Sequence, residues 1–248
     1  PDQIASWVSV GATVLFRETF DADTVVDCFE REGITSVTLV PTHWQRLFEA
    51  GLADREVDSL RVVGYSGAPI GKGTLEQLHG TFPDAAFTAY GSTETLNAVT
   101  KLTPERVDPD SPGKLGRPIA AVDVRIVDPA SGDPTAELDR GEVGEIVMSG
   151  PCIAEEIWEN ETATERRFVD GWWFSGDLGR VGPEGSLHLE GRTDNMIVSG
   201  GINIYAERIE SVLGSHDAVA AVAILGTEDE EWGEVVTAVV VPEGEVTE

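Results

Sequence analysis

The chain has 248 residues and carries 45 acidic against 17 basic side chains, which gives a formal net charge of −28 at pH 7. Hydrophobic residues make up 41% of it, enough for a folded core, and no apolar run approaches the roughly 18 residues of a membrane-spanning helix. So acidic a surface repels nucleic acids and anionic lipids, because their phosphates are bound by Lys and Arg.

Helix and strand signals alternate over the first third of the chain. Asp23 is a candidate N-cap for a helix that Gly33 can end. The apolar residues Val25, Val26 and Phe29 share one face of that helix. Further strands are predicted over 34–40, 60–65 and 86–90, and further helices over 42–50 and 74–82. This alternation predicts a parallel sheet whose faces are covered by helices.

The pattern changes after about Lys101, where four prolines interrupt a loop-rich stretch. Short antiparallel strands are predicted over 122–127, 142–148 and 186–189, joined by turns at 128–134 and 182–185. After Arg192 a Gly-Gly turn leads to a helix over 206–213 and to strands over 219–225 and 234–241. We therefore expect an α/β part, then a β-rich part, then a third part with one helix and two strands.

One segment carries several chemically useful groups in a row. The run YGSTET at 90–95 follows a predicted strand, so it lies at the carboxyl edge of the parallel sheet, where α/β folds bind ligands. It offers an aromatic ring, a glycine for close backbone approach, hydroxyls for phosphate oxygens and a carboxylate for a cation. Taken alone, the run is also compatible with a capped turn that opens a helix.

Other familiar signatures are absent. The run GAPIGK at 67–72 is one residue short of a phosphate loop, and Gly73 stands where Ser or Thr would bind magnesium. The four histidines lack metal-ligand spacing, and Cys28 and Cys152 form no C-x-x-C pair. A zinc cluster and a disulfide framework are therefore not expected. A reducing compartment is the default, which predicts a cytoplasmic protein.

The basic residues are unevenly divided, because lysine occurs only at Lys72, Lys101 and Lys114. Carboxylate-rich, lysine-poor surfaces suit proteins that stay soluble in concentrated salt, where self-repulsion is screened. We hypothesise a halophilic source organism. The alternative is an ordinary acidic cytoplasmic protein.

Five motifs in a fixed order carry a family resemblance. They are VPT at 40–42, SGAP at 66–69, YGSTET at 90–95, DGWWFSGDLG at 170–179 and GRTDNMIVSGGINI at 191–204. With them the chain resembles the adenylate-forming (AMP-binding) superfamily over about residues 12–242. It looks most like acyl-CoA and aryl-CoA synthetases of the fatty-acid or halobenzoate type. The resemblance implies that a carboxylic acid reacts with ATP to give an acyl-adenylate, which a thiol, usually that of coenzyme A, then attacks.

The same resemblance implies an α/β fold that is incomplete at both ends. Residues 1–110 would be the α/β part of a large adenylation domain, 111–192 its β-rich, distorted-barrel subdomain, and 193–248 the start of a small α+β C-terminal domain. The family's phosphate loop would lie upstream of residue 1 and its C-terminal lysine beyond residue 248. We therefore expect this chain alone to be inactive.

The resemblance also assigns nucleotide-binding and catalytic roles. Tyr90 would stack on adenine, Asp177 would accept hydrogen bonds from the ribose hydroxyls, and Arg192 would contact ribose or phosphate. Thr93 would bond the phosphate and Glu94 would hold Mg²⁺, and we take these two as the catalytic residues. The implied ATP/AMP-binding set is Gly67, Ala68, Pro69, Tyr90, Gly91, Ser92, Thr93, Asp177 and Arg192. The alternatives are that Asp177 caps a turn and that Arg192 pairs with a surface acid.

Three further assignments follow from the resemblance. The acyl pocket would be lined by His43, Ser66, Leu96 and Asn97, although His43 is equally compatible with an ordinary half-buried histidine. Asp194 would be the hinge, and Gly200 and Gly201 would approach the pantetheine of coenzyme A. The chain departs from the family at Asn195, Ala206 and Arg208, which bears on the details of the hinge.

The expected cofactors and partners are therefore ATP, Mg²⁺, coenzyme A and a small-molecule carboxylic acid, with a homodimer as one option. Two other interpretations stay open. One is a non-catalytic relative that binds adenylate, and the other is an adenylating enzyme that does not use coenzyme A. The identity of the acid does not follow from the sequence.

Overall fold

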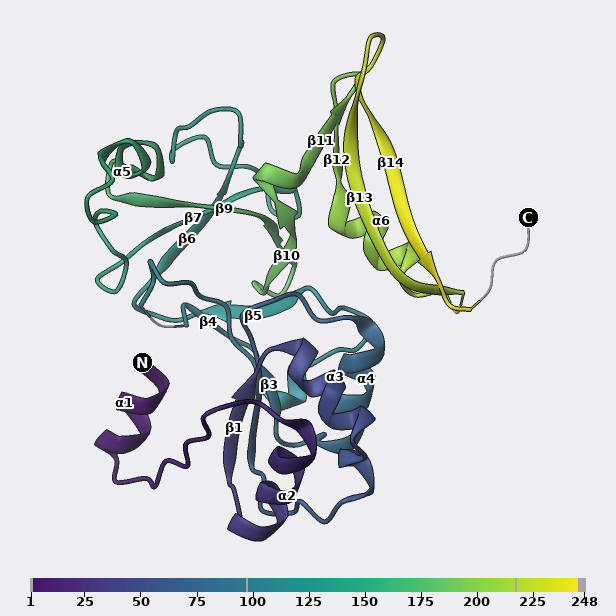
Figure 1. The fold of residues 1–248 in the computed structure, drawn as a ribbon. Helices are drawn as coiled ribbons and strands as arrows, with labels where there is room; N and C mark the ends of the chain where they lie inside the picture. The colour runs from purple at the N-terminus through teal and green to yellow at the C-terminus, as the bar shows by residue number, and fades with distance from the viewer. Residues whose placement is uncertain (1, 97, 217, 245–248) are drawn as a thin grey trace.

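The computed structural model describes residues 2–96, 98–216 and 218–244. It contains three sheets, which divide the molecule into three parts (Figure 1). We call them the parallel-sheet part (residues 2–88), the β-rich part (100–192) and the small part (193–242). The predicted fold class is confirmed: a parallel sheet with helices is followed by a curled antiparallel sheet and a small α+β unit. The boundaries that we predict at 110 and 192 remain predictions.

The parallel-sheet part holds β1 (Ser36–Leu39), β2 (Val62–Tyr65) and β3 (Ala86–Thr88), hydrogen-bonded in that order. Its helices are α1 (Asp2–Ser9), α2 (Ala22–Glu32), α3 (Pro41–Glu49) and α4 (Lys72–Thr81), and the short 3-10 helix η1 spans Leu52–Asp54. Helix α3 packs against both α2 and α4. The parallel register brings the carboxyl ends of all three strands to one edge, which faces the β-rich part in Figure 1.

Helix α2 corrects one prediction. Its N-cap is Asp21, whose Oδ1 accepts the backbone N–H of Thr24 at 2.9 Å. Asp23 instead lies in the first turn, so its assignment as the cap is wrong. A cap residue needs extended backbone and a donor three residues on, and Asp21 has both (φ −131°, ψ 121°). Gly33 ends the helix as predicted, in the left-handed conformation with φ 61°.

Trp44 anchors α3 to the sheet. Its side chain is fully buried, and its Nε1 donates a hydrogen bond to the carbonyl oxygen of Gly64 in β2 at 2.9 Å. A side chain at Gly64 would collide with Thr38, because a Cβ there would lie only 2.4 Å from Thr38 Oγ1. Because position 64 has no side chain, the side chain of Thr38 on the neighbouring strand β1 has room beside β2.

Trp44→Phe should destabilise the chain by ~1–3 kcal/mol, because it removes a buried donor and leaves unfilled volume. Trp158→Phe is the matched control, since the side chain of Trp158 is 80% exposed. Urea unfolding of both variants measures the difference. Equal midpoints for the two variants would contradict the anchoring role of Trp44.

The β-rich part is an antiparallel sheet in the order β4-β5-β10-β9-β7-β6, with β8 beside β9. The strands are β4 (Thr100–Lys101), β5 (Lys114–Pro118), β6 (Asp123–Val127), β7 (Gly144–Ser149), β8 (Phe168–Val169), β9 (Trp172–Val181) and β10 (Leu187–Arg192), with η2 (Pro104–Arg106) and α5 (Glu161–Arg167). Its core includes Ile146, Met148 and Trp173. A bridge between Thr88 and Leu102 joins this part to the parallel sheet.

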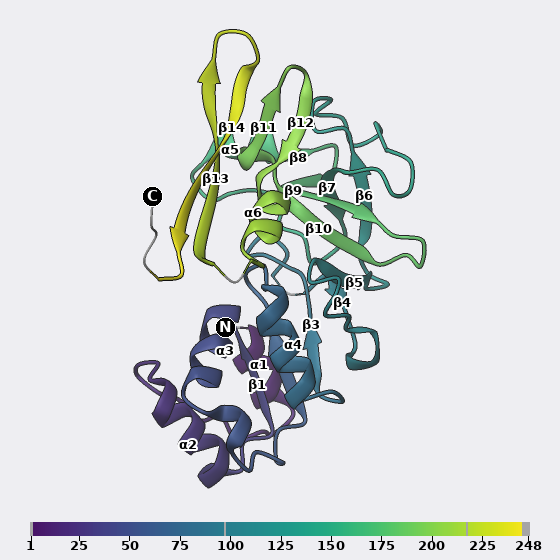
Figure 2. The same ribbon diagram turned by 90° about the vertical axis from the view of Figure 1, so that its right-hand side faces the viewer.

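The small part begins with η3 (Thr193–Asn195). It contains β11 (Met196–Ser199), β12 (Ile202–Tyr205), α6 (Ala206–Leu213), β13 (Val219–Asp229) and β14 (Gly233–Pro242). The strands form an antiparallel sheet in the order β12-β11-β14-β13. Helix α6 has the predicted bounds, packs on β13 and lies over β10, as Figures 1 and 2 show.

Charged and polar groups link the small part to β10 and its neighbours. Glu190 Oε1 lies 2.6 Å from Arg180 Nε, and Glu190 Oε2 lies 3.7 Å from Arg208 Nε on α6. Within the small part, Asn195 Nδ2 donates a hydrogen bond to Glu207 Oε1 at 2.8 Å, which connects η3 to α6. Glu190 therefore sits between a cation of the β-rich part and a cation of α6. Among the described residues, no helix is long and apolar enough to cross a membrane.

Candidate active site

The candidate site lies where the carboxyl edge of the parallel sheet meets β9 and β10. Ser66 Oγ donates to the carbonyl oxygen of Ala89 at 2.8 Å, which fixes the segment after β2 against the segment after β3. Two further bonds, from Thr88 Oγ1 to Tyr65 O at 2.7 Å and from Val99 N to Tyr90 O at 2.7 Å, hold the loops at this edge.

Asp177 is the centre of the site. Its Oδ2 accepts a hydrogen bond from Tyr90 Oη at 2.5 Å, and its Oδ1 lies 2.6 Å from Arg192 Nη1. Three predicted nucleotide residues therefore form one network, although Tyr90 and Asp177 are 87 positions apart in the chain. Arg192 does pair with an acid, but that acid belongs to the predicted site.

The site is electrostatically unusual. Burial raises the pKa of Asp177, against the opposing effects of the Tyr90 hydrogen bond and the Arg192 charge. Burial, followed by the Asp177 charge, raises the pKa of Tyr90 well above its usual range. The phenol therefore stays a donor, and the Asp177 carboxylate keeps lone pairs that neither Tyr90 nor Arg192 uses.

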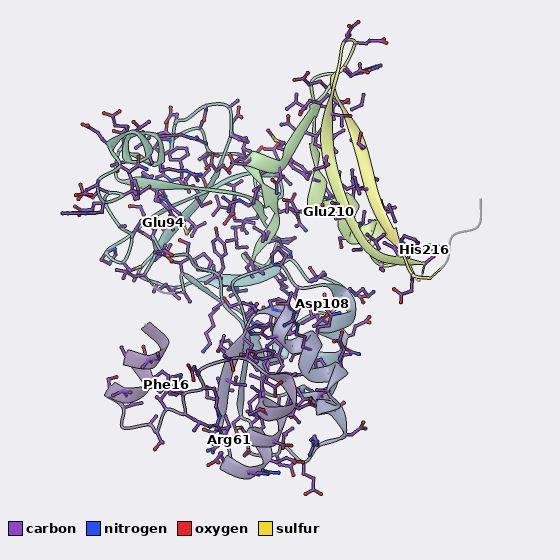
Figure 3. The ribbon with its side chains drawn as sticks, viewed as in Figure 1. Phe16, Arg61, Glu94, Asp108, Glu210 and His216 are labelled. Atoms are coloured by element: carbon purple, nitrogen blue, oxygen red, sulfur yellow. The ribbon has the colours of Figure 1, made fainter. Side chains whose placement is uncertain are left out.

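Glu94 lies in a closed turn beside this network. Thr95 Oγ1 accepts the backbone N–H of Ser92 at 2.9 Å and donates to Ser92 O at 3.0 Å, which closes the turn. Thr93 is exposed and Glu94 is half-buried. The Glu94 charge raises the pKa of Asp177. In Figure 3, Glu94 lies on the β-rich part, on the side away from Glu210 of α6.

This arrangement fits a hard cation. Within the described part of the chain, no hydrogen bond or ion pair is formed by the carboxylate of Glu94, and no group of three His, Cys, Asp or Glu could hold a metal ion. Mg²⁺ is usually bound by one or two carboxylates together with substrate phosphates and waters. The Glu94 carboxylate would be available as one such protein ligand.

The predicted acyl-pocket residues have different surroundings in the described structure, and their common role remains a prediction. His43 is half-buried, and its ring stacks on Phe20 with 3.8 Å between the centroids. Ser66 bonds to backbone at the sheet edge. Leu96 has φ 59° and is 71% exposed, so it packs against little of the described chain. Asn97 lies outside the described residues.

Gly200 and Gly201 lie at one end of the small part. Both have positive φ (56° and 81°) and form the turn between β11 and β12. Figures 1 and 2 show this turn pointing away from the parallel-sheet part, while α6 lies at the opposite end of the small part. Asp194, the predicted hinge, is exposed within η3, and its Oδ1 lies 3.7 Å from Arg166 Nη2.

A cavity of about 330 Å³ lies between α6 and the sheet edge. Its lining includes Ala68, Pro69 and Thr88 on one side and Glu207 and Arg208 on the other. Two residues predicted to line the adenine slot, Ala68 and Pro69, thus line this cavity. Tyr90, Asp177 and Arg192 do not line it. A larger hollow of about 950 Å³ between α3, α4 and α6 contains none of the predicted site residues.

Sequence reasoning missed the residues that hold Asp177. Glu145 is buried and accepts the backbone N–H of Gly176, and Ser175 Oγ accepts the backbone N–H of Asp177. The only signal in the sequence is a carboxylate within an apolar strand, EIVM at 145–148, and that pattern is also typical of a solvent-exposed edge.

A parallel sheet whose strand ends carry these groups, followed by a curled antiparallel sheet and a small α+β unit, defines the fold of adenylate-forming enzymes. The sequence profile of AMP-binding enzymes matches residues 3–158, and that of the AMP-binding enzyme C-terminal domain matches residues 208–248. The chain belongs to the AMP-binding enzyme family.

Curated relatives include an indoleacetate–CoA ligase of Aromatoleum aromaticum, 35% identical over 97% of this chain and 46% of the relative. A medium/long-chain-fatty-acid–CoA ligase of Mycobacterium tuberculosis is 34% identical over 93% of this chain and 40% of the relative. The chain thus spans less than half the length of these relatives.

Solved structures agree with this fold. An o-succinylbenzoate CoA synthetase from Bacillus subtilis, in complex with its acyl-adenylate intermediate, is 32% identical, with a TM-score of 0.86 over 99% of this chain and 49% of that one. An amide bond synthetase from Marinactinospora thermotolerans is also 32% identical, with a TM-score of 0.86 over 97% of this chain and 48% of that one.

Proposed function

We propose that the protein containing this chain is an ATP-dependent acid–thiol ligase that makes an acyl-adenylate and transfers the acyl group to coenzyme A. The observation that carries the proposal is the Asp177 carboxylate, held between Tyr90 and Arg192 at the sheet edge. CoA ligases for aryl and fatty acids among the relatives support it. The names of these relatives include an aryl acid and fatty acids. A fatty acid is therefore one of two substrate options for this protein, and a role in fatty acid metabolism would follow from it.

In this proposal the nucleotide binds across the sheet edge. The ring of Tyr90 and the backbone of Ala68 and Pro69 contact adenine. Asp177 accepts both ribose hydroxyls with lone pairs that Tyr90 and Arg192 leave free. A carboxylate oxygen of the acid then attacks the α-phosphorus and pyrophosphate leaves. Thr93 and Arg192 hold the phosphate oxygens in line for that step.

Glu94 would hold Mg²⁺, which when bound neutralises charge on the phosphates. The acyl carbonyl carbon is afterwards attacked by the thiol, and AMP leaves with its phosphate oxygen. Supporting structures include an o-succinylbenzoate CoA synthetase in complex with ATP and a magnesium ion.

The unpaired cysteines Cys28 and Cys152 support a cytoplasmic location.

The test is pyrophosphate release by the full-length protein with ATP and a panel of aryl and fatty acids. Acid-dependent release, followed by CoA thioester formation, is the expected result. Nucleotide binding without release for any acid would instead favour a non-catalytic adenylate-binding relative.

A second acceptor is favoured by one observation. The amide bond synthetase from Marinactinospora thermotolerans has the same TM-score as the CoA synthetase. An amine would attack the acyl-adenylate at the same carbonyl carbon as a thiol. Offering coenzyme A and a set of amines to the preformed acyl-adenylate separates the two functions, because only the true acceptor accelerates AMP release.

Asp194→Pro should separate the two half-reactions. Proline fixes φ near −65°, so a hinge at this position would be held in one orientation. We expect the full-length variant to keep one half-reaction and to lose most of the other. Asp194→Ala is the control, because it removes the Arg166 ion pair and leaves the backbone free. Comparable loss of both half-reactions in the proline variant would contradict the hinge.

The halophile hypothesis predicts a salt-dependent melting temperature. With a net charge of −28, the folded chain repels itself at low ionic strength, and added ions screen that repulsion. The melting temperature should rise between low and molar KCl. Sucrose at equal water activity is the control for general solvent exclusion. An unchanged melting temperature in KCl would contradict the hypothesis.

A further inference from the structure

Strand β9 bulges at the point where it presents Asp177. In the pairing of β7 with β9, Val147 lies opposite Phe174 and Glu145 lies opposite Leu178. One residue of β7 therefore faces three residues of β9, namely 175–177. Such bulges redirect side chains beside active sites and leave backbone groups without ladder partners. The pairing with β10 also shifts nearby, between Leu189 and Gly191.

Side chains replace the missing ladder bonds. Glu145 Oε1 accepts the N–H of Gly176 at 2.9 Å, and Ser175 Oγ accepts the N–H of Asp177 at 3.0 Å. Ser175 Oγ in turn donates to Ile146 O at 2.7 Å. Thr193 Oγ1 donates to Gly176 O at 3.2 Å from the other side. Gly176 is thus fixed through both its N–H and its carbonyl oxygen.

The backbone at position 176 favours glycine. Its φ is 75°, in the left-handed region, and a Cβ there would collide with Arg167 Nη1. Arg167 donates a hydrogen bond to Phe174 O at 3.2 Å, at the start of the bulge. Position 176 therefore has a backbone conformation that glycine adopts readily and that a residue with a Cβ would not.

Glu145 is an unexpected residue for a purely structural bond. It is only 8% exposed, and burying a carboxylate is unfavourable unless it is well compensated. Burial raises the pKa of Glu145, and Asp177 adds to this, while the Gly176 N–H, Arg167 and Arg166 act in the opposite direction. Of these charged neighbours, Asp177 belongs to the candidate site.

We infer that Glu145 is a positioning residue of the nucleotide site: it holds the β9 bulge in the shape that aims the Asp177 carboxylate at the ribose hydroxyls. The inference rests on the proposed function, because it requires Asp177 to bind ribose. Glu145 itself touches no ligand. It acts through the Gly176 N–H, one residue before Asp177.

The test is the ribose preference of the full-length protein, measured as the Kd for 2′,3′-dideoxy-ATP divided by the Kd for ATP. Glu145→Met keeps the side-chain volume but provides no acceptor of comparable strength for Gly176, and we expect it to lower the ratio about tenfold. Glu145→Gln retains an acceptor oxygen and should restore most of the ratio. A merely structural role would lower the melting temperature of Glu145→Met and leave the ratio unchanged.

Glu142→Ala is the matched control. Its carboxylate also accepts a backbone N–H, that of Asp139 at 2.8 Å, but in an exposed turn before β7. A wild-type protein without ribose preference would overturn the proposed function. A ratio lost in Asp177→Ala but kept in Glu145→Met would overturn only this inference. If Glu145→Met does not fold, a Glu145→Gln ratio as low as that of Asp177→Ala also overturns it.

Discussion

Glu94→Gln should lower the rate of acyl-adenylate formation by the full-length protein about 100-fold, which corresponds to ~2.7 kcal/mol of activation free energy. The amide keeps the shape of the side chain but loses the charge that a magnesium ion requires. The turn itself should persist, because it is closed by Thr95 and Ser92 and not by the carboxylate of Glu94.

The measurement is pyrophosphate release at several Mg²⁺ concentrations. Glu155→Gln is the matched control, an exposed carboxylate in the loop that bonds to Glu94 through Ala154 N. We expect the control to retain wild-type rates and Glu94→Gln to require more Mg²⁺. Equal rates in the two variants would exclude Glu94 as the metal-binding residue.

Asp177→Ala should weaken ATP binding about 100-fold, because two ribose hydroxyls lose a charged acceptor at ~1.5 kcal/mol each. Binding of 2′,3′-dideoxy-ATP, which lacks both hydroxyls, should change much less. Asp123→Ala, at an exposed position on β6, is the control. If Asp177→Ala weakens both nucleotides equally, the ribose role of Asp177 is wrong.

The same residue predicts a pH dependence of ATP binding. Only the ionised carboxylate accepts from both hydroxyls, and burial raises the pKa of Asp177. The affinity for ATP should therefore fall as the pH drops through this pKa, at a higher pH than an ordinary Asp would produce. The stability of the folded chain should depend on pH in the opposite direction. Because the pKa of Asp177 is raised in the folded state, its ionisation destabilises the fold as the pH rises.

Local patterns predicted some elements well and others not at all. Helix α6 was predicted to the residue, because its apolar residues repeat at helical spacing and face the sheet. Strand β9 was not predicted as a strand, although its residues were recognised as a motif. Its bulge at 175–177 breaks the alternation that identifies a strand.

Some residues of the candidate site could be predicted from the sequence and others could not. The motif order located Tyr90, Asp177 and Arg192, but their direct bonds depend on a strand pairing that joins distant segments. Glu145 was missed because a buried carboxylate becomes distinctive only beside the N–H that it accepts. The sequence assigns no role to Thr95, which is fully buried and closes the turn.

Glu190 has a consequence for how the small part is oriented. It is paired closely with Arg180, at 2.6 Å, and loosely with Arg208, at 3.7 Å. If the predicted hinge at Asp194 turned α6 away from β10, Glu190 would keep its nearer partner Arg180, and Arg208, already 63% exposed, would become more hydrated. Exchanging such an ion pair for hydrated charges changes the free energy by only ~1 kcal/mol or less. The Arg208 ion pair would therefore oppose a rotation about the predicted hinge at Asp194 only weakly, and less at high ionic strength.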